Sequence, residues 1–232
     1  MANRLSGTEC LTYWIPGTTP QVVGAARVVQ RCSDVEYKKS RLAFWNEGFE
    51  TVSDAHAVTP DLDTLVGLFY PSREPLGRFE EVDSHDLARD YRMLLAHDSH
   101  MTVTVERFHN GPVDVRVLDS RLTGTHYARK IVLSRQSDGV VVQFGIMRLD
   151  FSCVSPEVRR EVESQSTPLG RILIQHNVLR AVHLTKLWKV TPGDELRRLF
   201  NLAPGPITYG RTAVIHFDGE PAVELLEIVA PV

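Results

Sequence analysis

The chain has 232 residues with a hydrophobic content of 43% and a charged content of 24%, which suit one domain, or one domain with an extension, around an ordinary core. The formal net charge is −3 and no run of Lys or Arg stands out, so we expect no nucleic acid as the main partner. The apolar runs are too short to span a bilayer, and residues 1–11 lack the apolar stretch of a secretory signal. Cys10, Cys32 and Cys153 are odd in number and have no C-x-x-C spacing, which favours a cytoplasmic protein over a disulfide framework.

The first 85 residues have a more irregular pattern than the rest of the chain. Residues 61–70 are an exception, because Asp61 can cap a helix, apolar positions follow it, and Pro71 ends the segment. We therefore predict a short amphipathic helix there. The region has too many aromatic residues for a disordered tail, so we expect residues 1–85 to be an extension docked on a main domain of residues 86–232.

From Ser84 onward the hydrophobic pattern becomes regular. Apolar residues at helical spacing predict a helix over 84–96, and helix-start signals predict two more from Ser155 and Pro168. Alternating patterns and turn residues predict strands, mostly in adjacent hairpins, at 102–108, 113–118, 127–134, 140–149, 207–217 and 222–229. This order predicts an α+β fold, an antiparallel sheet of about six strands with helices packed on one side.

Arg129 stands in the middle of an apolar strand. By the two-residue period of a strand, its side chain shares a face with Ile131 and Leu133. A guanidinium on the covered face of a sheet needs an anionic partner, because an unpaired buried charge is very costly. That partner could be a carboxylate of the protein or a ligand carboxylate held by two hydrogen bonds.

Glu227 is the corresponding carboxylate in the last predicted strand. It shares a face with Val223, Leu225 and Val229, and aliphatic surroundings raise a carboxyl pKa toward the range of a general acid. Glu224 lies on the opposite face of the same strand, so the pattern alone does not choose between the two. A glutamate that faces solvent from an edge strand is the plain alternative.

The Pro168-Leu169-Gly170 turn opens a predicted helix, whose free backbone N–H groups could meet an anion, although most such turns only start a helix. Arg211 could add positive charge to the same site or could be a surface residue. We predict no metal site, because His, Cys, Asp and Glu do not occur at ligand spacing. We find no nucleotide-binding loop.

Four short segments occur in a fixed order along the main domain. They are Asp98–Thr102, Tyr127–Leu133 with its Arg-x-Ile-x-Leu pattern, Thr167–Leu173 with Pro-Leu-Gly-Arg, and Glu227–Pro231. In order and approximate spacing they resemble the chorismate pyruvate-lyase family over residues 86 to 232. The resemblance implies the antiparallel α+β fold of that family, which agrees with the strands predicted above, and it implies a reaction without metal or organic cofactor.

The resemblance also implies roles for particular residues. Arg129 would hold a carboxylate, the backbone at Leu169 and Gly170 would contact the ligand, Met101 would line the pocket, and Glu227 would act as the acid/base. Arg211 is a further candidate for ligand binding because of its positive charge, not because of the resemblance. The predicted function is then a lyase that eliminates pyruvate from chorismate to give 4-hydroxybenzoate.

The sequence departs from the family in an extra residue within Asp98–Thr102, a long N-terminal extension and a long segment over 191–206. Two alternatives therefore stay open. One is a non-catalytic domain that binds a small aromatic carboxylate, as a sensor or carrier. The other is a related enzyme for another carboxylated metabolite. The sequence makes no prediction of oligomeric state.

Overall fold

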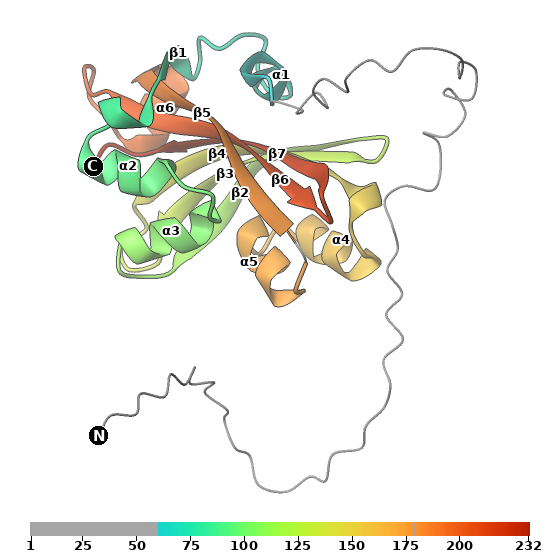
Figure 1. Ribbon diagram of the computed structural model, residues 1–232. Coiled ribbons are helices and arrows are strands. Elements are labelled where there is room, and N and C mark those ends of the chain that lie inside the picture. The colour runs from blue at the N-terminus through green and yellow to red at the C-terminus, as the bar shows by residue number, and fades with distance from the viewer. Residues whose placement is uncertain (1–59, 179) are drawn as a thin grey trace, which may run out of the picture. The chain divides into compact units, whose positions relative to one another are not determined.

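The computed structural model of the protein describes residues 60–178 and 180–232. These residues form one seven-stranded sheet in which every neighbouring pair is antiparallel, in the order β1-β5-β6-β7-β4-β3-β2 (Figure 1). The strands are β1 (Gly77–Val82), β2 (Val113–Thr123), β3 (His126–Arg135), β4 (Val141–Asp150), β5 (Arg180–Pro192), β6 (Thr208–Phe217) and β7 (Glu220–Val229).

The helices lie in two layers on the sheet (Figure 1). The α-helices are α1 (Leu62–Gly67), α2 (Arg89–Leu95), α3 (Met101–Phe108), α4 (Pro156–Glu163), α5 (Leu169–Gln175) and α6 (Asp194–Phe200), with short 3-10 helices η1 (Ser84–Asp86) and η2 (Phe151–Cys153). Helices α2 to α5 pack together on one face, as predicted, and the α+β class with an antiparallel sheet is confirmed. Helices α1 and α6 add a smaller layer on the opposite face.

Two helix starts follow the local signals in the sequence. The Asp61 carboxylate accepts a hydrogen bond from the Thr64 N–H at 2.9 Å at the start of α1. The Ser155 hydroxyl accepts one from the Val158 N–H at 3.3 Å at the start of α4, with Pro156 in the first turn. Because these caps satisfy N–H groups that have no partner within the helix, short-range sequence was enough to locate both starts.

Two predicted hairpins are confirmed, β3 with β4 and β6 with β7. Strand β7 also pairs with β4 in the middle of the sheet, so the two hairpins join there. This long-range pairing sets Glu227 of β7 opposite Gly145 of β4, while Arg129 of β3 lies opposite Met147 of β4. The predicted arginine and glutamate are thereby brought to one region of one face.

The prediction of a strand over 102–108 is wrong, because these residues form helix α3. The segment Thr-Val-Thr-Val alternates like a strand, yet Met101, Thr102 and Val105 are the buried positions, which is helical spacing. Packing of this face against α2 and α5 outweighs the preference of β-branched residues for strands. The predicted hairpin between 102–108 and 113–118 is therefore also absent, and β2 pairs with β3 instead.

A long strand, β5 (Arg180–Pro192), lies second from the edge of the sheet and was not predicted. Its pairing with β6 is irregular between Leu184 and Lys186, which shifts the alternation of buried side chains along the strand. Val182 and Leu187 face the helices α2 to α5, whereas Val190 faces α1 and α6. The segment over 191–206, predicted as a long loop, contains helix α6.

The predicted extension, residues 1–85, falls partly outside the described residues. The described part contains α1, which packs against β4 and β7, and β1, which pairs with β5 from Gly77↔Pro192 to Val82↔Leu187. These elements belong to the same sheet and core as the rest of the chain. A boundary at residue 85 and docking of the preceding residues stay predictions.

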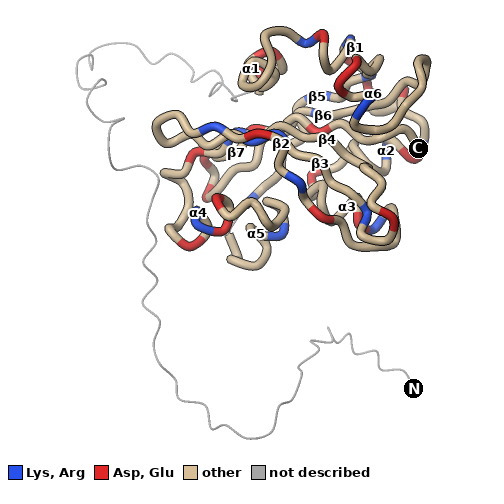
Figure 2. Tube along the Cα trace, turned by 180° about the vertical axis from the view of Figure 1, so that it is seen from behind, with Lys and Arg blue, Asp and Glu red and all other residues tan. Residues whose placement is uncertain are grey.

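Charged residues of both signs are interspersed over the described part of the chain (Figure 2). Many form ion pairs at the surface, for example Arg159 with Glu163 at 3.0 Å. No helix among residues 60–178 and 180–232 is both long and apolar enough to cross a membrane.

Candidate ligand-binding site

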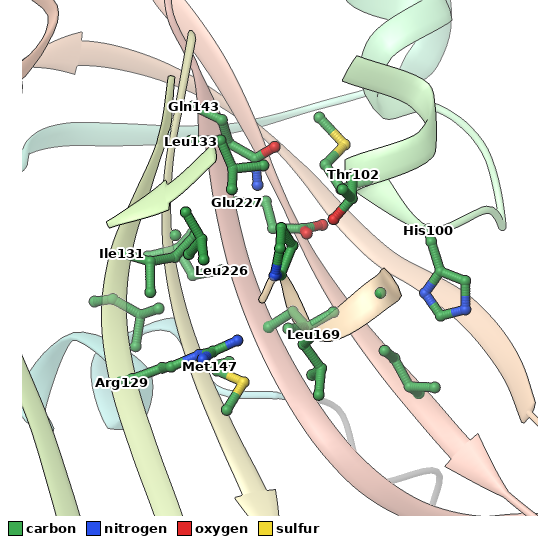
Figure 3. A pocket seen from close by; sticks show the side chains of 18 of the residues that line it. His100, Thr102, Arg129, Ile131, Leu133, Gln143, Met147, Leu169, Leu226 and Glu227 are labelled. Carbon is green, nitrogen blue, oxygen red and sulfur yellow. The ribbon is translucent and has the colours of Figure 1, made fainter. Parts of the chain in front are cut away.

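A cavity of about 60 Å³ lies between the sheet and the helices α3 and α5. Most of its wall is aliphatic, with a few polar groups among them (Figure 3). The lining residues come from six neighbouring strands, β2 to β7, as well as the two helices, so no short segment of sequence could form the site by itself. A cavity of this kind is the default place to look for a small-molecule ligand.

All six residues predicted for the site line this one cavity. They are Met101, Arg129, Leu169, Gly170, Arg211 and Glu227. They lie on α3, β3, α5, β6 and β7, far apart in sequence, and pairing of the strands brings them together. Their predicted contacts with a ligand stay predictions.

Arg129 is buried, with only 2% of its surface exposed, and it makes no ion pair with any described residue. Its Nη2 donates one long hydrogen bond to the Thr167 carbonyl at 3.4 Å, and its Nε and Nη1 are buried without a hydrogen-bond partner. Burial lowers the pKa of the guanidinium, and the Tyr127 hydroxyl partly offsets that effect. Because the pKa of arginine starts so high, the side chain stays cationic, and it is therefore an uncompensated positive charge at the cavity wall.

Glu227 has a partner, in contrast to Arg129. Arg211 Nε donates to Glu227 Oε2 at 2.7 Å, and both side chains are almost fully buried. The partner arises from the sheet register, since Arg211 of β6 lies directly opposite Glu227 of β7. Glu227 is therefore not an isolated carboxylate among aliphatic side chains, the condition on which the predicted acid/base role depended.

The other N–H groups of Arg211 donate hydrogen bonds to the last residue of α2 and to the loop between α2 and α3. Nη1 donates to the His97 carbonyl at 2.7 Å and to the Leu95 carbonyl at 3.5 Å, and Nη2 donates to the Ser99 carbonyl at 3.1 Å. This side chain has 0% of its surface exposed. We conclude that Arg211 lines the cavity but that its hydrogen-bonding groups are already occupied by the protein.

Glu224, the other candidate in the last strand, lies on the opposite face. It forms an ion pair with Arg148 there, across the register pair that joins β4 to β7. The strand alternation did not choose between Glu227 and Glu224. The cavity lies on the face of Glu227, so Glu227 lines it and Glu224 does not.

His100 lies at the edge of the cavity, just before α3, beside the first turn of α5. Its Nε2 accepts a hydrogen bond from Arg180 Nε. Burial, with the nearby charges of Arg180 and Arg211, lowers the pKa of His100 to about 4, so the ring is neutral at pH 7. Gly170 packs closely here, because a Cβ at that position would lie 3.2 Å from Thr102 Oγ1 and 3.3 Å from His100 Cβ.

Gln143 is a site residue that the sequence did not predict. It is 3% exposed, lines the cavity from β4, and its Oε1 is buried without a hydrogen-bond partner (Figure 3). The available signal was a single polar residue within the apolar run 140–147, on the same face as Met147 by strand alternation. His100, at the edge of the cavity, was not predicted as a site residue either.

Among residues 60–178 and 180–232, one group of potential metal ligands lies close together in space, and it consists of Asp83, His85 and Asp86. All three are exposed, and none of them lines the cavity.

No protein-family model matches the sequence, and no curated protein matches it. Solved structures with a similar fold include the ligand-binding domain of a GntR-family transcriptional regulator from Bordetella bronchiseptica, with 14% identity over 50% of this chain and 85% of that one, at a TM-score of 0.41. The effector domain of PhnF from Mycobacterium smegmatis matches with 11% identity over 57% of this chain and 88% of that one, at a TM-score of 0.44. The transcriptional regulator YydK from Bacillus subtilis matches with 12% identity over 50% of this chain and 57% of that one, at a TM-score of 0.36.

These comparisons correct the predicted enzyme. The matching structures are regulators, or ligand-binding and effector domains of regulators, and no lyase is among those named above. The prediction of a chorismate pyruvate-lyase is therefore wrong, although the resemblance to that family led to the correct fold class. The pairing of Glu227 with Arg211 is consistent with this correction.

Proposed function

We propose that this domain is a non-catalytic binding domain, a sensor or carrier, for a small molecule with one carboxylate. The observation that carries the proposal is Arg129, a buried cation at the cavity wall with no counter-ion among the described residues. An unpaired buried charge costs several kcal/mol, and a ligand carboxylate would remove that cost by two charge-assisted hydrogen bonds.

The charges around the cavity favour a ligand with a single negative charge. Of the two lining arginines, Arg211 is neutralised by Glu227, and His100 is neutral at pH 7. One positive charge is therefore left over. A second carboxylate on the ligand would be buried without a partner, in the same cavity as Glu227, which is unfavourable.

The volume and lining of the cavity limit the body of the ligand. A cavity of about 60 Å³ favours a small metabolite over a dinucleotide or a peptide. The aliphatic lining includes Ile131, Leu133, Met147 and Leu169, so the body attached to the carboxylate is expected to be apolar. Leu169 and Gly170, predicted to contact the ligand, would form the wall beside it.

The test measures binding of matched pairs of acids and neutral amides to the full chain by calorimetry. Benzoate and hexanoate are compared with benzamide and hexanamide, in the wild type and in Arg129→Met. We expect a carboxylate to bind and its amide to bind far more weakly, and Arg129→Met to weaken carboxylate binding by roughly 10- to 150-fold, the loss expected for hydrogen bonds to a charged group. The acid is expected to be recovered unchanged after incubation.

Arg148→Met is the matched control, because Arg148 lies on the opposite face, paired with Glu224. It is expected to leave carboxylate binding unchanged. Carboxylate affinity that is the same in Arg129→Met and the wild type, or no binding of any carboxylate, would contradict the proposal.

The proposed partner of the domain is the small carboxylate. Two further predictions belong to the proposal, that the protein has no nucleic-acid partner and that it is cytoplasmic. They rest only on the composition and on the three cysteines.

A further inference from the structure

A second polar group of the cavity lacks a partner, at the end away from Arg129. Gln143 Oε1 is buried and accepts no hydrogen bond from the described residues, although the side chain lines the cavity. Buried acceptors are almost always satisfied in folded proteins, and one that is not costs about 1 to 3 kcal/mol. The protein could have avoided this cost with an apolar residue, since the neighbours of Gln143 in the sheet, Leu133 and Val229, are apolar.

The sheet register sets the separation of the two unpartnered groups. Arg129 lies opposite Met147, and Gln143 is four residues from Met147 along β4 on the same face. Four residues of a strand span about 13 Å. Figure 3 shows Gln143 and Arg129 at opposite ends of the view, with Glu227 between them.

Space between the two groups is left open by Gly145. This residue lies between Gln143 and Met147 on the same face, opposite Glu227, and lines the cavity without a side chain. A Cβ there would have only ordinary contacts, the nearest at 3.5 Å to Ile131 Cγ1 and to the Leu226 carbonyl. Nothing in the backbone therefore requires glycine at this position, and its effect is to keep the path from Arg129 to Gln143 free.

We propose that Gln143 is a specificity-determining residue that accepts a hydrogen bond from a hydroxyl group at the end of the ligand distant from its carboxylate. This inference rests on the proposed function, since it presumes a carboxylate at Arg129. A hydroxyl fits better than an ammonium group, because Gln143 is neutral and Glu227 already has Arg211 as its counter-ion. A buried ammonium would then lack full compensation.

The experiment compares straight-chain carboxylates with their ω-hydroxy and ω-amino forms, from butanoate to octanoate, by calorimetry on the full chain. For the chain length that reaches Gln143, we expect the ω-hydroxy acid to bind at least tenfold more tightly than the unsubstituted acid. The ω-amino acid is expected to bind more weakly than the ω-hydroxy acid.

Two substitutions then connect this preference to one side chain. Gln143→Leu is expected to reverse it, so that the unsubstituted acid binds more tightly, and Gln143→Met, which also lacks an acceptor and is closer to glutamine in length, provides a second variant with the same expected reversal if the first does not fold. Gln136→Leu, in the exposed turn after β3 and bonded to Asp114, is the matched control and is expected to retain the wild-type preference.

The outcomes separate this inference from the proposed function. Carboxylates that bind through Arg129 with no gain from the hydroxyl at any chain length, or a gain that persists in Gln143→Leu, would overturn the role of Gln143 and leave the carboxylate site intact. Failure of every carboxylate to bind would overturn both.

Discussion

Arg129 and Arg211 face the same cavity from strands on either side of β4 and β7, and they are buried to the same degree, yet their surroundings differ completely. Arg211 has a carboxylate at 2.7 Å and three backbone carbonyls around it, whereas Arg129 has one long hydrogen bond to the Thr167 carbonyl and the Tyr127 hydroxyl nearby, but no carboxylate among the described residues. Burial of a charge therefore does not by itself indicate function. A saturated arginine stabilises the fold, and an unsaturated one is available to a ligand.

Removal of Arg211 is expected to have the largest effect on the stability of the fold. Arg211→Met leaves Glu227 buried without its counter-ion and frees the carbonyls of Leu95, His97 and Ser99, so we expect the free energy of unfolding to fall by about 3 to 5 kcal/mol. Urea denaturation measures the loss. Adding Glu227→Gln to the same chain removes the stranded charge and is expected to recover part of it, and a loss below about 1 kcal/mol in the single variant would contradict a structural role.

Removal of Arg129 is expected to act in the opposite direction. Arg129→Met replaces an unpaired buried cation with an apolar side chain of similar length, so the free energy of unfolding without ligand should rise by about 1 to 2 kcal/mol. Denaturation in the absence of any carboxylate measures this gain. A variant that is less stable than the wild type would mean that Arg129 already has a partner in the folded protein.

The pH dependence of stability is expected to report on His100, which lies beside Arg180 at the edge of the cavity. Burial lowers the pKa of His100 in the folded state to about 4, while the unfolded chain has the ordinary value near 6.5. The unfolded state therefore binds the proton more tightly, and stability that is complete above pH 6.5 is lost as the pH falls from about 6.5 toward about 4.

His100→Gln tests this dependence, since the amide oxygen can still accept from Arg180 but does not titrate. Over that pH range we expect the variant to lose less stability than the wild type, by on the order of 1 to 2 kcal/mol once partial exposure is considered. Parallel curves for the two proteins, from denaturation at a series of pH values, would assign the acid sensitivity to other groups.

The smallest effect is expected at the matched glutamate on the other face. Glu224→Gln weakens an ion pair with Arg148 that is partly exposed, so stability should change by less than about 1 kcal/mol, and carboxylate affinity should stay that of the wild type. A calorimetric titration that shows altered ligand binding in Glu224→Gln would contradict the assignment of the cavity to the face of Glu227.

Helix starts that depend only on residues close together in the sequence were predicted correctly. The Asp61 and Ser155 caps act within a few residues, so the sequence contains all of the interaction. Residues 102–108 misled the prediction, because the same alternating Thr and Val residues are compatible with a strand or a helix until their neighbours are present. Strand β5 was hidden by the irregularity at Leu184, where the buried face changes.

The amino-acid sequence was enough to predict the antiparallel α+β class, the aliphatic neighbours that share a sheet face with Arg129 and with Glu227, and six residues that line the cavity. It was not enough to predict which charges are paired. Arg211 reaches Glu227 because strands β6 and β7 align them, and no comparable alignment provides a carboxylate for Arg129 or a donor for Gln143. Strand alternation is a property of the local backbone, whereas ion pairing depends on register between distant strands, and that register is fixed only when the whole sheet forms.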